Sequence, residues 1–288
     1  MNNYCKCPLN YAGGKFRVLH ELEKNFPKNI PTLYDLFGGA GNVTANIKAN
    51  KYVFNEINTY LYEIIKGLKD KDSQYTIDKI HMILDEYNPI EKEGFLNLRT
   101  LYNSENLQDK WIYLIVLASF SFNYMARFNN KHQYNGSYAK GICKYNTSIE
   151  NNIINFSKLL KERNIDFYNK DFREVDLSSL TSSDLVYLDP PYYLSCGVYQ
   201  DGKRGFSGWT KEEELNMYKL CDNINSKGCK FALSNLIESK GNIHTELYEW
   251  IDKNGYNLIY INKDKGLYNT NYHKKVRYKD IEVLITNY

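Results

Sequence analysis

Short apolar runs, bordered by polar residues, glycine or proline, recur along the chain and predict strands. They occupy residues 32–37, 51–54, 165–168, 184–188 and 281–286. Runs of this kind are typical of the buried strands of a parallel sheet. Between the first two runs, residues 43–49 can begin a helix. This order of strand, helix and strand predicts an α/β fold with a Rossmann-like sheet.

A different pattern fills the interval from residue 61 to about residue 145. Apolar residues there recur at the three- and four-residue spacings of an amphipathic helix. The helical segments are residues 61–65, 77–84, 95–102 and 111–122. Because the strand pattern resumes only at residue 165, we interpret the interval as a small helical domain inserted into the sheet. The predicted division is a sheet domain of residues 1–60 and 146–288 and an inserted domain of residues 61–145.

The composition limits the classes of protein to be considered. With 288 residues and six scattered cysteines, the chain needs no disulfides, so we expect reduced thiols and a cytoplasmic location. The net charge of +3 is small, so attraction for nucleic acid must come from local clusters of charge. No apolar run approaches the ~20 residues of a membrane span, and no signal peptide is visible. Cys5 and Cys7 supply at most half of a metal site, so no metal is expected.

Glycines follow the first predicted strand, in the segment Gly38-Gly39-Ala40-Gly41-Asn42. Glycine lets backbone N–H groups approach a ligand because no Cβ stands in the way. The second strand ends at Asn55-Glu56, where an acid can accept hydrogen bonds from ribose hydroxyls. The glycine spacing fits neither the dinucleotide-binding pattern nor the phosphate-binding loop, so the segment is poorly suited to bind the phosphates of NAD or ATP. The unit predicts a nucleoside site, with an ordinary strand-to-helix loop as the alternative.

The segment Asp189-Pro190-Pro191-Tyr192 directly follows the apolar run at residues 184–188. Ligands of open α/β sheets bind at the carboxyl ends of the strands, so this turn is a candidate functional site. The prolines lack N–H groups, and their carbonyls form, with the Asp189 carboxylate, a set of acceptors. Tyr192 offers a flat face for stacking. The combination suits a planar base with an exocyclic amino group, whereas a plain loop would use these residues as a solvated turn.

Basic and amide side chains alternate with aromatic ones at the end of the helical interval, in residues 123–141. Such polar side chains contact phosphates and base edges, and aromatic rings can stack or wedge between bases. The composition alone fits a DNA-reading hairpin and a polar surface hairpin equally well. A second basic cluster, residues 273–279, is expected to be a solvated loop, with non-specific contact to phosphates as the alternative. The candidate DNA-binding residues are Arg127, Asn129, Asn130, Lys131, Tyr134, Asn135, Tyr138 and Lys140.

Over nearly its whole length the chain resembles the Dam-type DNA adenine-N6 methyltransferases, the D12 class (alpha group), and particularly the compact phage members. Tyr11-Ala12-Gly13-Gly14-Lys15 resembles the family's opening motif, and Asp35-Leu36-Phe37-Gly38-Gly39-Ala40-Gly41 resembles its cofactor loop. Three further segments resemble the ribose-binding segment, the segment beside the cofactor adenine and the strand after the catalytic one. They are Asn55-Glu56-Ile57-Asn58, Lys170-Asp171-Phe172 and Phe231-Ala232-Leu233-Ser234-Asn235.

The resemblance implies an enzyme that transfers a methyl group from S-adenosyl-L-methionine to the N6 of an adenine flipped out of duplex DNA. Residues 1–60 and 146–288 then form the catalytic domain, and residues 61–145 form the target-recognition domain. The product is S-adenosylhomocysteine, and no metal is implied. The implied catalytic residues are Asp189, Pro190, Pro191 and Tyr192. The implied cofactor-binding residues are Tyr11, Lys15, Asp35, Phe37, Gly38, Gly39, Gly41, Asn42, Glu56, Asp171, Phe172 and Asp189.

The target sequence is predicted from the first half of the hairpin. That half resembles the family's recognition loop and places Arg127 where an arginine reads guanine, which makes GATC the favoured target. The other half departs from the family, because Tyr138-Ala139-Lys140-Gly141 stands where a Pro-Phe-Gly run is usual. No second arginine follows there.

Two alternatives come from other classes of protein. Methyltransferases that act on rRNA adenine or on a glutamine side chain usually begin the tetrapeptide with Asn and lack the helical insert. A non-catalytic DNA-binding protein would leave Asp189, Glu56 and the glycine turn unexplained. The expected partners are double-stranded DNA and a cognate restriction endonuclease, without a membrane. We expect a monomer or weak dimer in the cytoplasm of a bacterial or phage-infected cell.

Overall fold

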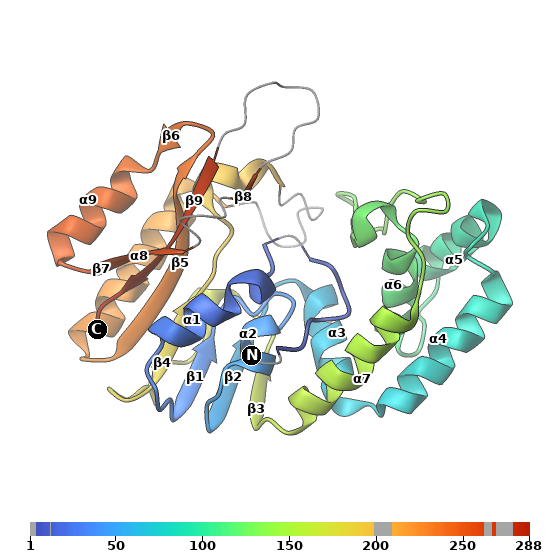
Figure 1. The fold of residues 1–288 in the computed structure, drawn as a ribbon, viewed down its shortest axis with the longest axis horizontal. Helices are drawn as coiled ribbons and strands as arrows, with labels where there is room; N and C mark the ends of the chain where they lie inside the picture. Colours follow the sequence, from blue (N-terminus) through green and yellow to red (C-terminus); the bar gives the residue numbers. More distant parts are fainter. Residues whose placement is uncertain (1–3, 12, 199–208, 262–266, 269–278) are drawn as a thin grey trace.

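The computed structural model describes residues 4–11, 13–198, 209–261, 267–268 and 279–288, and its centre is a large β-sheet (Figure 1). The strand order is β3-β2-β1-β4-β5-β9-β7, with β6 paired to β5 and β8 paired to β9. The strands are β1 (Thr32–Asp35), β2 (Lys51–Asn55), β3 (Ile165–Tyr168), β4 (Leu185–Leu188), β5 (Lys230–Ser239), β6 (Asn242–Ile243), β7 (Asn257–Ile261), β8 (Leu267–Tyr268) and β9 (Lys279–Thr286). The predicted basic loop lies outside the described residues, except for Lys279 at the start of β9.

The strands from β3 across to β5 are parallel, so their carboxyl ends meet at one edge of the sheet. From β1 the chain continues to β2 on one side, while β4 lies on the other side. Such a reversal of strand order opens a crevice at the carboxyl edge, which is where open α/β sheets bind ligands. The last strand, β9, runs antiparallel between β5 and β7. The Rossmann-like prediction is confirmed, and the antiparallel strand adds to it.

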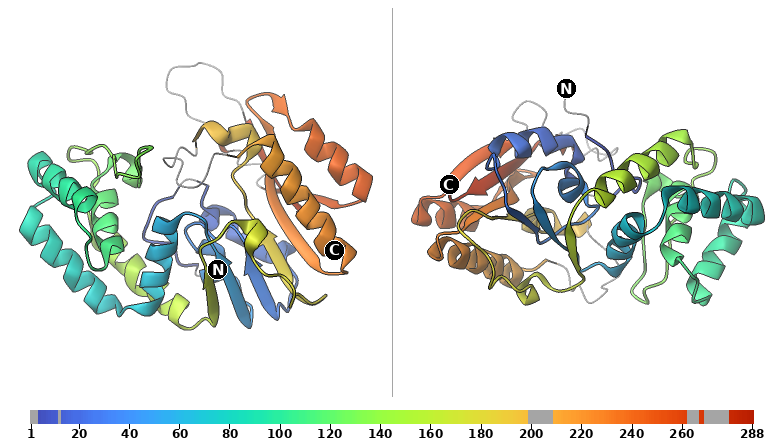
Figure 2. Two further views of the ribbon diagram at one scale, coloured as in Figure 1. Left: turned by 180° about the vertical axis from the view of Figure 1, so that it is seen from behind. Right: turned by 90° about the horizontal axis from the view of Figure 1, so that it is seen from below.

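Helices cover both faces of the sheet (Figure 2). Side chains alternate along each strand, so neighbouring residues pack against opposite helical layers. On one face, Leu33 and Leu185 pack with α1 (Leu19–Asn25) and α2 (Asn42–Asn46). On the other face, Tyr34 and Val186 pack with α8 (Lys211–Ser226) and α9 (Thr245–Asn254). The sheet is therefore buried on both sides, as its continuous apolar runs require.

A helical lobe lies beside β3, at the end of the sheet opposite β7 (Figure 1). Its helices are α3 (Thr59–Asp70), α4 (Ser73–Tyr87), α5 (Lys92–Ser104), α6 (Lys110–Ser119) and α7 (Thr147–Lys161). Asn58 and Asp72 cap α3 and α4 by accepting backbone N–H bonds. One apolar cluster joins the lobe to Ala40 and Phe54 of the sheet side, so the two parts share a core. The division at residues 60 and 145 stays a prediction.

The central helix of the lobe, α6, is buried on all sides rather than on one stripe. Helices α3, α4 and α5 each contact it, which explains its uninterrupted apolar sequence. Across the described parts of the chain, no helix is both long enough and apolar enough to cross a membrane.

The predicted strands and the four predicted helical segments are confirmed, with small differences at their ends. Helices α7, α8 and α9 were not among the predictions, and strand β5 extends the predicted segment at 231–235 in both directions. The short α2 contains five residues where seven were expected, and it ends at Asn46 before the extended backbone of Ile47.

Candidate active site

The glycine turn joins β1 to α2 at the carboxyl edge of the sheet. Gly38 donates its N–H to the carbonyl of Asn55 at 2.8 Å, which ties the turn to the end of β2. A Cβ at Gly38 would lie 2.1 Å from the ring of Phe54, so this position has no room for a side chain. Gly41 has a φ of 68°, in the left-handed region that favours glycine. Packing against the second strand therefore fixes the turn close to the strand ends.

A pocket opens above this turn and encloses about 910 Å³, including the part open to solvent. Its walls come from the N-terminal segment, the glycine turn, the end of β2 and the turn after β4. Eleven of the predicted catalytic and cofactor-binding residues line it. They are Tyr11, Lys15, Asp35, Phe37, Gly38, Gly39, Asn42, Glu56, Asp189, Pro190 and Pro191. Segments far apart in sequence thus meet in one pocket.

Glu56 is buried at the pocket wall and fixed by the backbone. One carboxylate oxygen accepts the N–H of Gly39 at 2.7 Å, and the other accepts the N–H of Asn58 at 2.7 Å. Hydrogen bonds from both the glycine turn and the start of α3 prevent the carboxylate from rotating. A preorganised acceptor of this kind suits the hydroxyl groups of a sugar.

Two further carboxyl groups lie at the pocket floor around one ammonium group. Asp35 is 1% exposed and accepts a hydrogen bond from Thr44 at 2.7 Å. The pKa of Asp35 is raised to about 7, mainly because the carboxyl group is buried; the hydrogen bond from Thr44 opposes this rise, and the charge of Asp189 adds to it. Burial also raises the pKa of Asp189 to about 6, while the Lys15 ammonium, 2.6 Å from its carboxylate, lowers it. The floor carries more acid than base, which favours a cationic ligand.

The turn after β4 delivers Asp189 and Pro190 to the pocket but keeps Tyr192 away from it. Tyr192 is 5% exposed, and its hydroxyl donates to the Glu282 carboxylate at 2.7 Å. The Lys15 ammonium lies 4.9 Å from the centre of the Tyr192 ring. The open stacking face expected from the sequence is therefore not available in this structure, because the ring packs inside the protein.

Asp171 and Phe172 lie beside the pocket rather than among its lining residues. Asp171 forms a two-pronged ion pair with Arg173, with both distances at 2.7 Å, and it also begins a short 3₁₀ helix. Phe172 is buried, with its ring centre 5.1 Å from that of Phe37, a lining residue. Gly41 likewise contributes to the turn without lining the pocket. A direct role of these residues with a cofactor stays a prediction.

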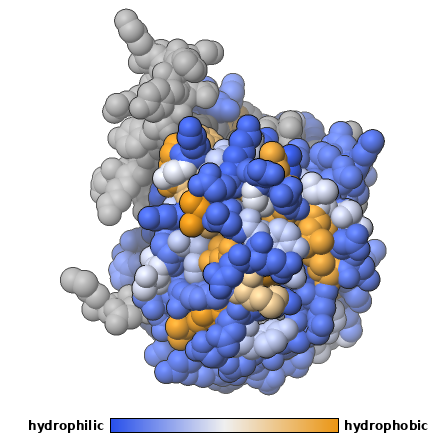
Figure 3. Space-filling view, turned by 90° about the vertical axis from the view of Figure 1, so that its right-hand side faces the viewer, coloured by the Kyte–Doolittle hydropathy of each residue, from blue (hydrophilic) through white to orange (hydrophobic). Residues whose placement is uncertain are grey.

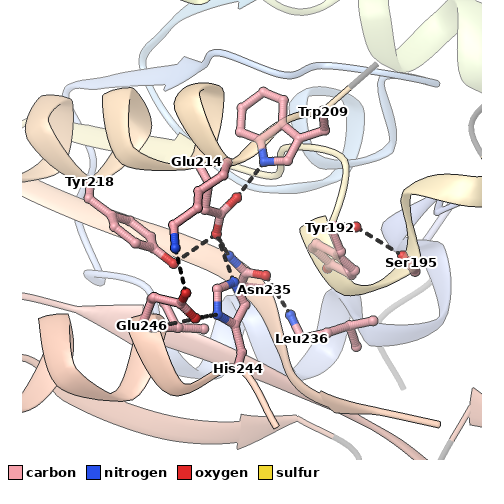
Figure 4. Close-up of polar contacts among 11 residues, drawn as sticks. Tyr192, Ser195, Trp209, Glu214, Tyr218, Asn235, Leu236, His244 and Glu246 are labelled. Carbon is pink, nitrogen blue, oxygen red and sulfur yellow. Dashed lines mark hydrogen bonds and ion pairs between the residues drawn. The ribbon is translucent and has the colours of Figure 1, made fainter. Parts of the chain in front are cut away.

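A buried polar cluster behind the pocket was not found from the sequence (Figure 4). The Glu214 carboxylate accepts hydrogen bonds from the Trp209 indole, from Tyr218 at 2.9 Å and from Asn235 at 2.7 Å. His244 lies 3.4 Å from the same carboxylate. The Trp209 ring packs edge-on against Phe37, so the cluster supports the pocket wall from behind. An acid on the apolar face of α8 was the sequence signal for it.

The predicted hairpin is present and is held by its own side chains. Backbone hydrogen bonds join Asn135 to Arg127 and Asn129 to Gln133, both at 2.9 Å. The Asn129 side chain accepts two backbone N–H bonds, from Lys131 and Gln133, and closes the tip. These contacts assign Asn129 to the construction of the turn.

The candidate DNA-binding residues of the hairpin fall into two groups. Tyr134 is 1% exposed and packs against Tyr102 and Phe128, so its side chain belongs to the lobe's core. Tyr138 is partly buried, packs against Phe95 and donates to a backbone carbonyl. The sequence interpretation of both tyrosines as DNA contacts therefore lacks support from their positions. The exposed members are Arg127, Asn130, Lys131, Asn135 and Lys140.

The N-terminal thiols are buried or half-buried and are not part of a ligand cluster. Burial raises the pKa of Cys5 to about 11 and that of Cys7 to about 12, which makes both thiols poor metal ligands and poor nucleophiles. Among the residues described by the structure, no three His, Cys, Asp or Glu side chains are grouped to hold a metal ion.

The fold and the pocket define an α/β protein with an acidic nucleoside-type site at its carboxyl edge. The chain belongs to the D12 class N6 adenine-specific DNA methyltransferase family, whose model matches residues 11–266. It is 38% identical to the modification methylase StsI of Streptococcus sanguinis over 288 residues and 37% identical to the type II methyltransferase M.FokI of Planomicrobium okeanokoites over 289 residues. The DNA adenine methylase of Salmonella typhi is 23% identical over 230 residues.

The lengths of these relatives differ from that of the chain. The alignments cover 99% of this chain but 43% of StsI, and 100% of this chain but 43% of M.FokI. The Salmonella typhi protein is covered to 79%, as is this chain. The chain therefore spans less than half the length of the first two relatives.

Proposed function

We propose that the protein transfers a methyl group from S-adenosyl-L-methionine to the exocyclic N6 of adenine in duplex DNA. The observation that carries the proposal is the Asp189 carboxylate, which lines the same pocket as the glycine turn and Glu56. Membership of the adenine-specific family supports the reaction and the base. The target-recognition role of the helical lobe and its hairpin is part of the same proposal.

The acidic floor of the pocket supports this choice of cofactor. S-adenosyl-L-methionine supplies the electrophilic methyl group, and it carries positive charge on its sulfonium and ammonium groups. Asp35 and Asp189 have raised pKa values in the protein without ligand, so a bound cation stabilises their ionised forms. Glu56 is fixed at the wall to accept hydrogen bonds from ribose hydroxyls. The residues present therefore fit the cofactor.

Asp189 and Pro190 act on the target amino group. The adenine nitrogen is a weak nucleophile because its lone pair is delocalised into the ring. The Asp189 carboxylate and the Pro190 carbonyl can accept its two N–H bonds and turn the lone pair out of the ring plane. This is positioning and electrostatic catalysis without a covalent enzyme intermediate. With a pKa of about 6, the carboxyl group of Asp189 is mostly ionised at neutral pH, as an acceptor must be.

The adenine must leave the duplex to reach this turn, which costs a few kcal/mol. Stacking on Tyr192 would offset part of that cost, at ~1–3 kcal/mol per base. Because Tyr192 is buried here, a base can contact its ring only after neighbouring atoms move. Pro190 and Pro191 line the pocket already and offer the first apolar surface to an entering base.

Arg127 is the proposed reader of guanine, since its side chain is exposed on the hairpin. GATC stays the favoured target. A cognate restriction endonuclease is the proposed partner, in keeping with the modification and type II names of StsI and M.FokI. The outer face of the helical lobe is mostly hydrophilic, with smaller apolar patches between the polar residues (Figure 3). The hydrophilic character of this one face is in keeping with the proposed monomer or weak dimer.

The experiment is methyl transfer with labelled S-adenosyl-L-methionine and equal amounts of duplex DNA, rRNA or protein. We expect label in duplex DNA, and N6-methyladenine after hydrolysis of that DNA. Asp189→Ala should lower kcat by ~10²-fold or more while duplex binding remains and cofactor binding weakens far less, because the carboxylate acts on the amino group and Asp35 and Glu56 still face the cofactor. Asp189→Asn keeps one acceptor oxygen and should retain a trace of activity.

The matched control is Asp166→Asn. Asp166 lies on the outer strand β3 and forms a half-exposed ion pair with Lys51 of β2. This substitution should leave kcat unchanged. Wild-type turnover in Asp189→Ala would contradict the catalytic assignment. Label in rRNA or protein, with none in DNA, would contradict the proposed substrate.

A further inference from the structure

Glu282 is a buried acid that the catalytic scheme above does not use. It lies in the middle of β9, paired with Leu236 of β5 and Ile261 of β7, and it is 6% exposed. Its neighbours Val283, Leu284 and Ile285 are fully buried apolar residues. A carboxylate in such surroundings is costly unless charged or polar groups compensate it. The identity of those groups therefore indicates what the residue does.

The compensating groups belong to the catalytic turn and the pocket. Oxygen Oε1 of Glu282 accepts the Tyr192 hydroxyl at 2.7 Å and lies 3.6 Å from the Lys15 ammonium. The same ammonium lies 2.6 Å from the Asp189 carboxylate and donates to the Gly13 carbonyl at 3.0 Å. Oxygen Oε1 of Glu282 thus contacts both Tyr192 and Lys15, which lie beside Asp189 in space.

Sharing of Lys15 between two carboxylates matters for the acceptor role of Asp189. An ammonium paired with Asp189 alone would be drawn further onto that carboxylate and would occupy lone pairs that the target amino group needs. Glu282, 3.6 Å away, attracts the same ammonium. Tyr192, which follows Asp189 by three residues, is fixed by the same oxygen, so the turn cannot rotate independently of β9.

We propose that Glu282 is a positioning residue, which orients the Asp189 carboxylate through Lys15 and Tyr192. The proposal rests on the proposed function, because it assumes that Asp189 receives the amino group of adenine. It extends the active site to a strand that is remote in sequence from every predicted site residue.

Glu282 is one of several titratable groups that face Asp189. The others are Lys15, Asp35 of β1, Tyr187 of β4 and Tyr192 of the turn itself. Lys15 and Tyr192 lower the pKa of Asp189, whereas Glu282 raises it. Removing the charge of Glu282 should therefore move the acid limb of the pH profile of kcat/KM to lower pH.

The first test is Glu282→Gln, which removes the charge while keeping an oxygen that can accept from Tyr192. We expect kcat to fall by about 10- to 100-fold, the range for a hydrogen bond to a charged group. The dissociation constants for S-adenosyl-L-methionine and duplex DNA, measured by calorimetry, should stay within about threefold, because Glu282 does not line the pocket. Asp280→Asn is the matched control, since Asp280 lies on the same strand and accepts from Ser239 at 2.7 Å. It should retain wild-type kcat.

The second test is a double-mutant cycle with Tyr192→Phe, which keeps the ring but removes the hydroxyl that Glu282 accepts. If the two residues act through one contact, the double variant loses little more kcat than the worse single variant. Fully additive losses, or wild-type kcat and an unshifted pH profile in Glu282→Gln, would overturn the proposal. Thermal melts show whether Glu282→Gln is folded. If it is not, the kcat and the pH profile of Tyr192→Phe decide whether the contact orients Asp189.

The activities of two variants distinguish the proposed function from the positioning role of Glu282. An active Asp189→Ala variant contradicts the proposed function itself. An inactive Asp189→Ala variant together with an unimpaired Glu282→Gln variant contradicts only the positioning role of Glu282.

Discussion

The side-chain amide of Asn103 forms two hydrogen bonds with the backbone of Tyr134. Its oxygen accepts the Tyr134 N–H at 2.8 Å, and its nitrogen donates to the Tyr134 carbonyl at 3.0 Å. Asn103 lies near the end of α5, so these two bonds attach the backbone of the hairpin to a helix of the lobe. The Tyr134 hydroxyl is also bonded to Ser121, on the inner side of the hairpin. The hairpin is therefore attached to the lobe at its backbone as well as through its aromatic rings.

Asn103→Ala should weaken duplex binding while leaving cofactor binding unchanged. The variant leaves two backbone groups of Tyr134 without their partner, which costs about 1–3 kcal/mol for buried groups and loosens the attachment of the hairpin to α5, where the ring contacts with Tyr102 and Phe95 and the bond from Arg99 to Gly136 remain. We expect the Kd for target DNA to rise about 5- to 50-fold, measured by fluorescence anisotropy. Ser104→Ala, on the exposed neighbouring residue, is the control. Equal DNA affinity in Asn103→Ala and the wild type would show that the two hydrogen bonds between Asn103 and Tyr134 are not needed for DNA binding.

Arg127→Ala should relax the base preference at one position of the target. A two-pronged arginine–guanine contact provides ~1–3 kcal/mol of discrimination, whereas a phosphate contact affects all sequences alike. Sequencing of methylated bases, first with the wild type and then with the variant, measures this directly. Arg127→Lys keeps the charge but loses the planar pair of donors, so it should also relax the preference.

Two outcomes would contradict this role of Arg127. A uniform loss at all sites with a shallower salt dependence would identify a phosphate contact. A wild-type target that contains no guanine would remove the basis of the GATC prediction.

Glu56→Ala should raise the KM for S-adenosyl-L-methionine more than it lowers kcat. A ribose contact is made equally in the ground state and the transition state, and its loss should weaken binding by ~1.5–3 kcal/mol. Since Glu56 also accepts the N–H groups of Gly39 and Asn58, Glu56→Gln is needed as a milder variant that keeps an acceptor. Calorimetry on both variants is the measurement. Unchanged cofactor affinity would make Glu56 a structural acid of the glycine turn.

Binding of S-adenosyl-L-methionine should strengthen as the pH rises from 6 to 8. The pKa of Asp35 is about 7 before the ligand binds, and a cation favours its ionised form. The expected gain in affinity is about tenfold over these two pH units, by proton linkage. Calorimetry in buffers of different ionisation enthalpy should also detect proton release at pH 6. Asp35→Asn should bind more weakly and with a flatter pH profile, and a steep profile in that variant would exclude Asp35 as its source.

The same carboxyl group affects the stability of the protein without ligand. Its folded-state pKa is raised above the ordinary value of 3.8, so its stabilising contribution is complete below pH 3.8 and is lost as the pH rises through about 7. Asp35→Asn does not titrate, so its melting temperature should exceed that of the wild type by roughly a few degrees at pH 8. The gap should narrow toward pH 5, and a constant gap would contradict the raised pKa.

Much of the sheet was predictable because its strands are short, apolar and bordered by turn residues. The runs that became β1, β2 and β4 are buried on both faces, which leaves a clear local signal. The order of the strands was not predictable in this way. In particular, the antiparallel insertion of β9 between β5 and β7 depends on contacts between distant segments. Helix α7 was missed because its apolar residues follow a polar stretch that resembles a loop.

The lining of the pocket was predictable where it comes from contiguous residues, as in the glycine turn and at Asp189-Pro190-Pro191. The site was not predictable where a role depends on which side chains meet in space. Tyr192 and Tyr134 both carry rings that can stack on bases, but packing buries the first against Lys15 and the second against Tyr102. Glu282 is an acid in an apolar strand, and its proposed role follows only from the contacts that β9 gives it with Tyr192 and Lys15.

The position of β9 in the sheet sets an order of events during protein synthesis. Until residues 279–286 have left the ribosome, β5 and β7 each lack the neighbour that separates them in the finished sheet. Lys15 also lacks its second carboxylate until then. A nascent or prematurely terminated chain therefore has exposed strand edges and an incomplete charge network, and it is open to aggregation. A chain without residues 279–286 thus lacks both the strand that separates β5 from β7 and the carboxylate that shares Lys15 with Asp189.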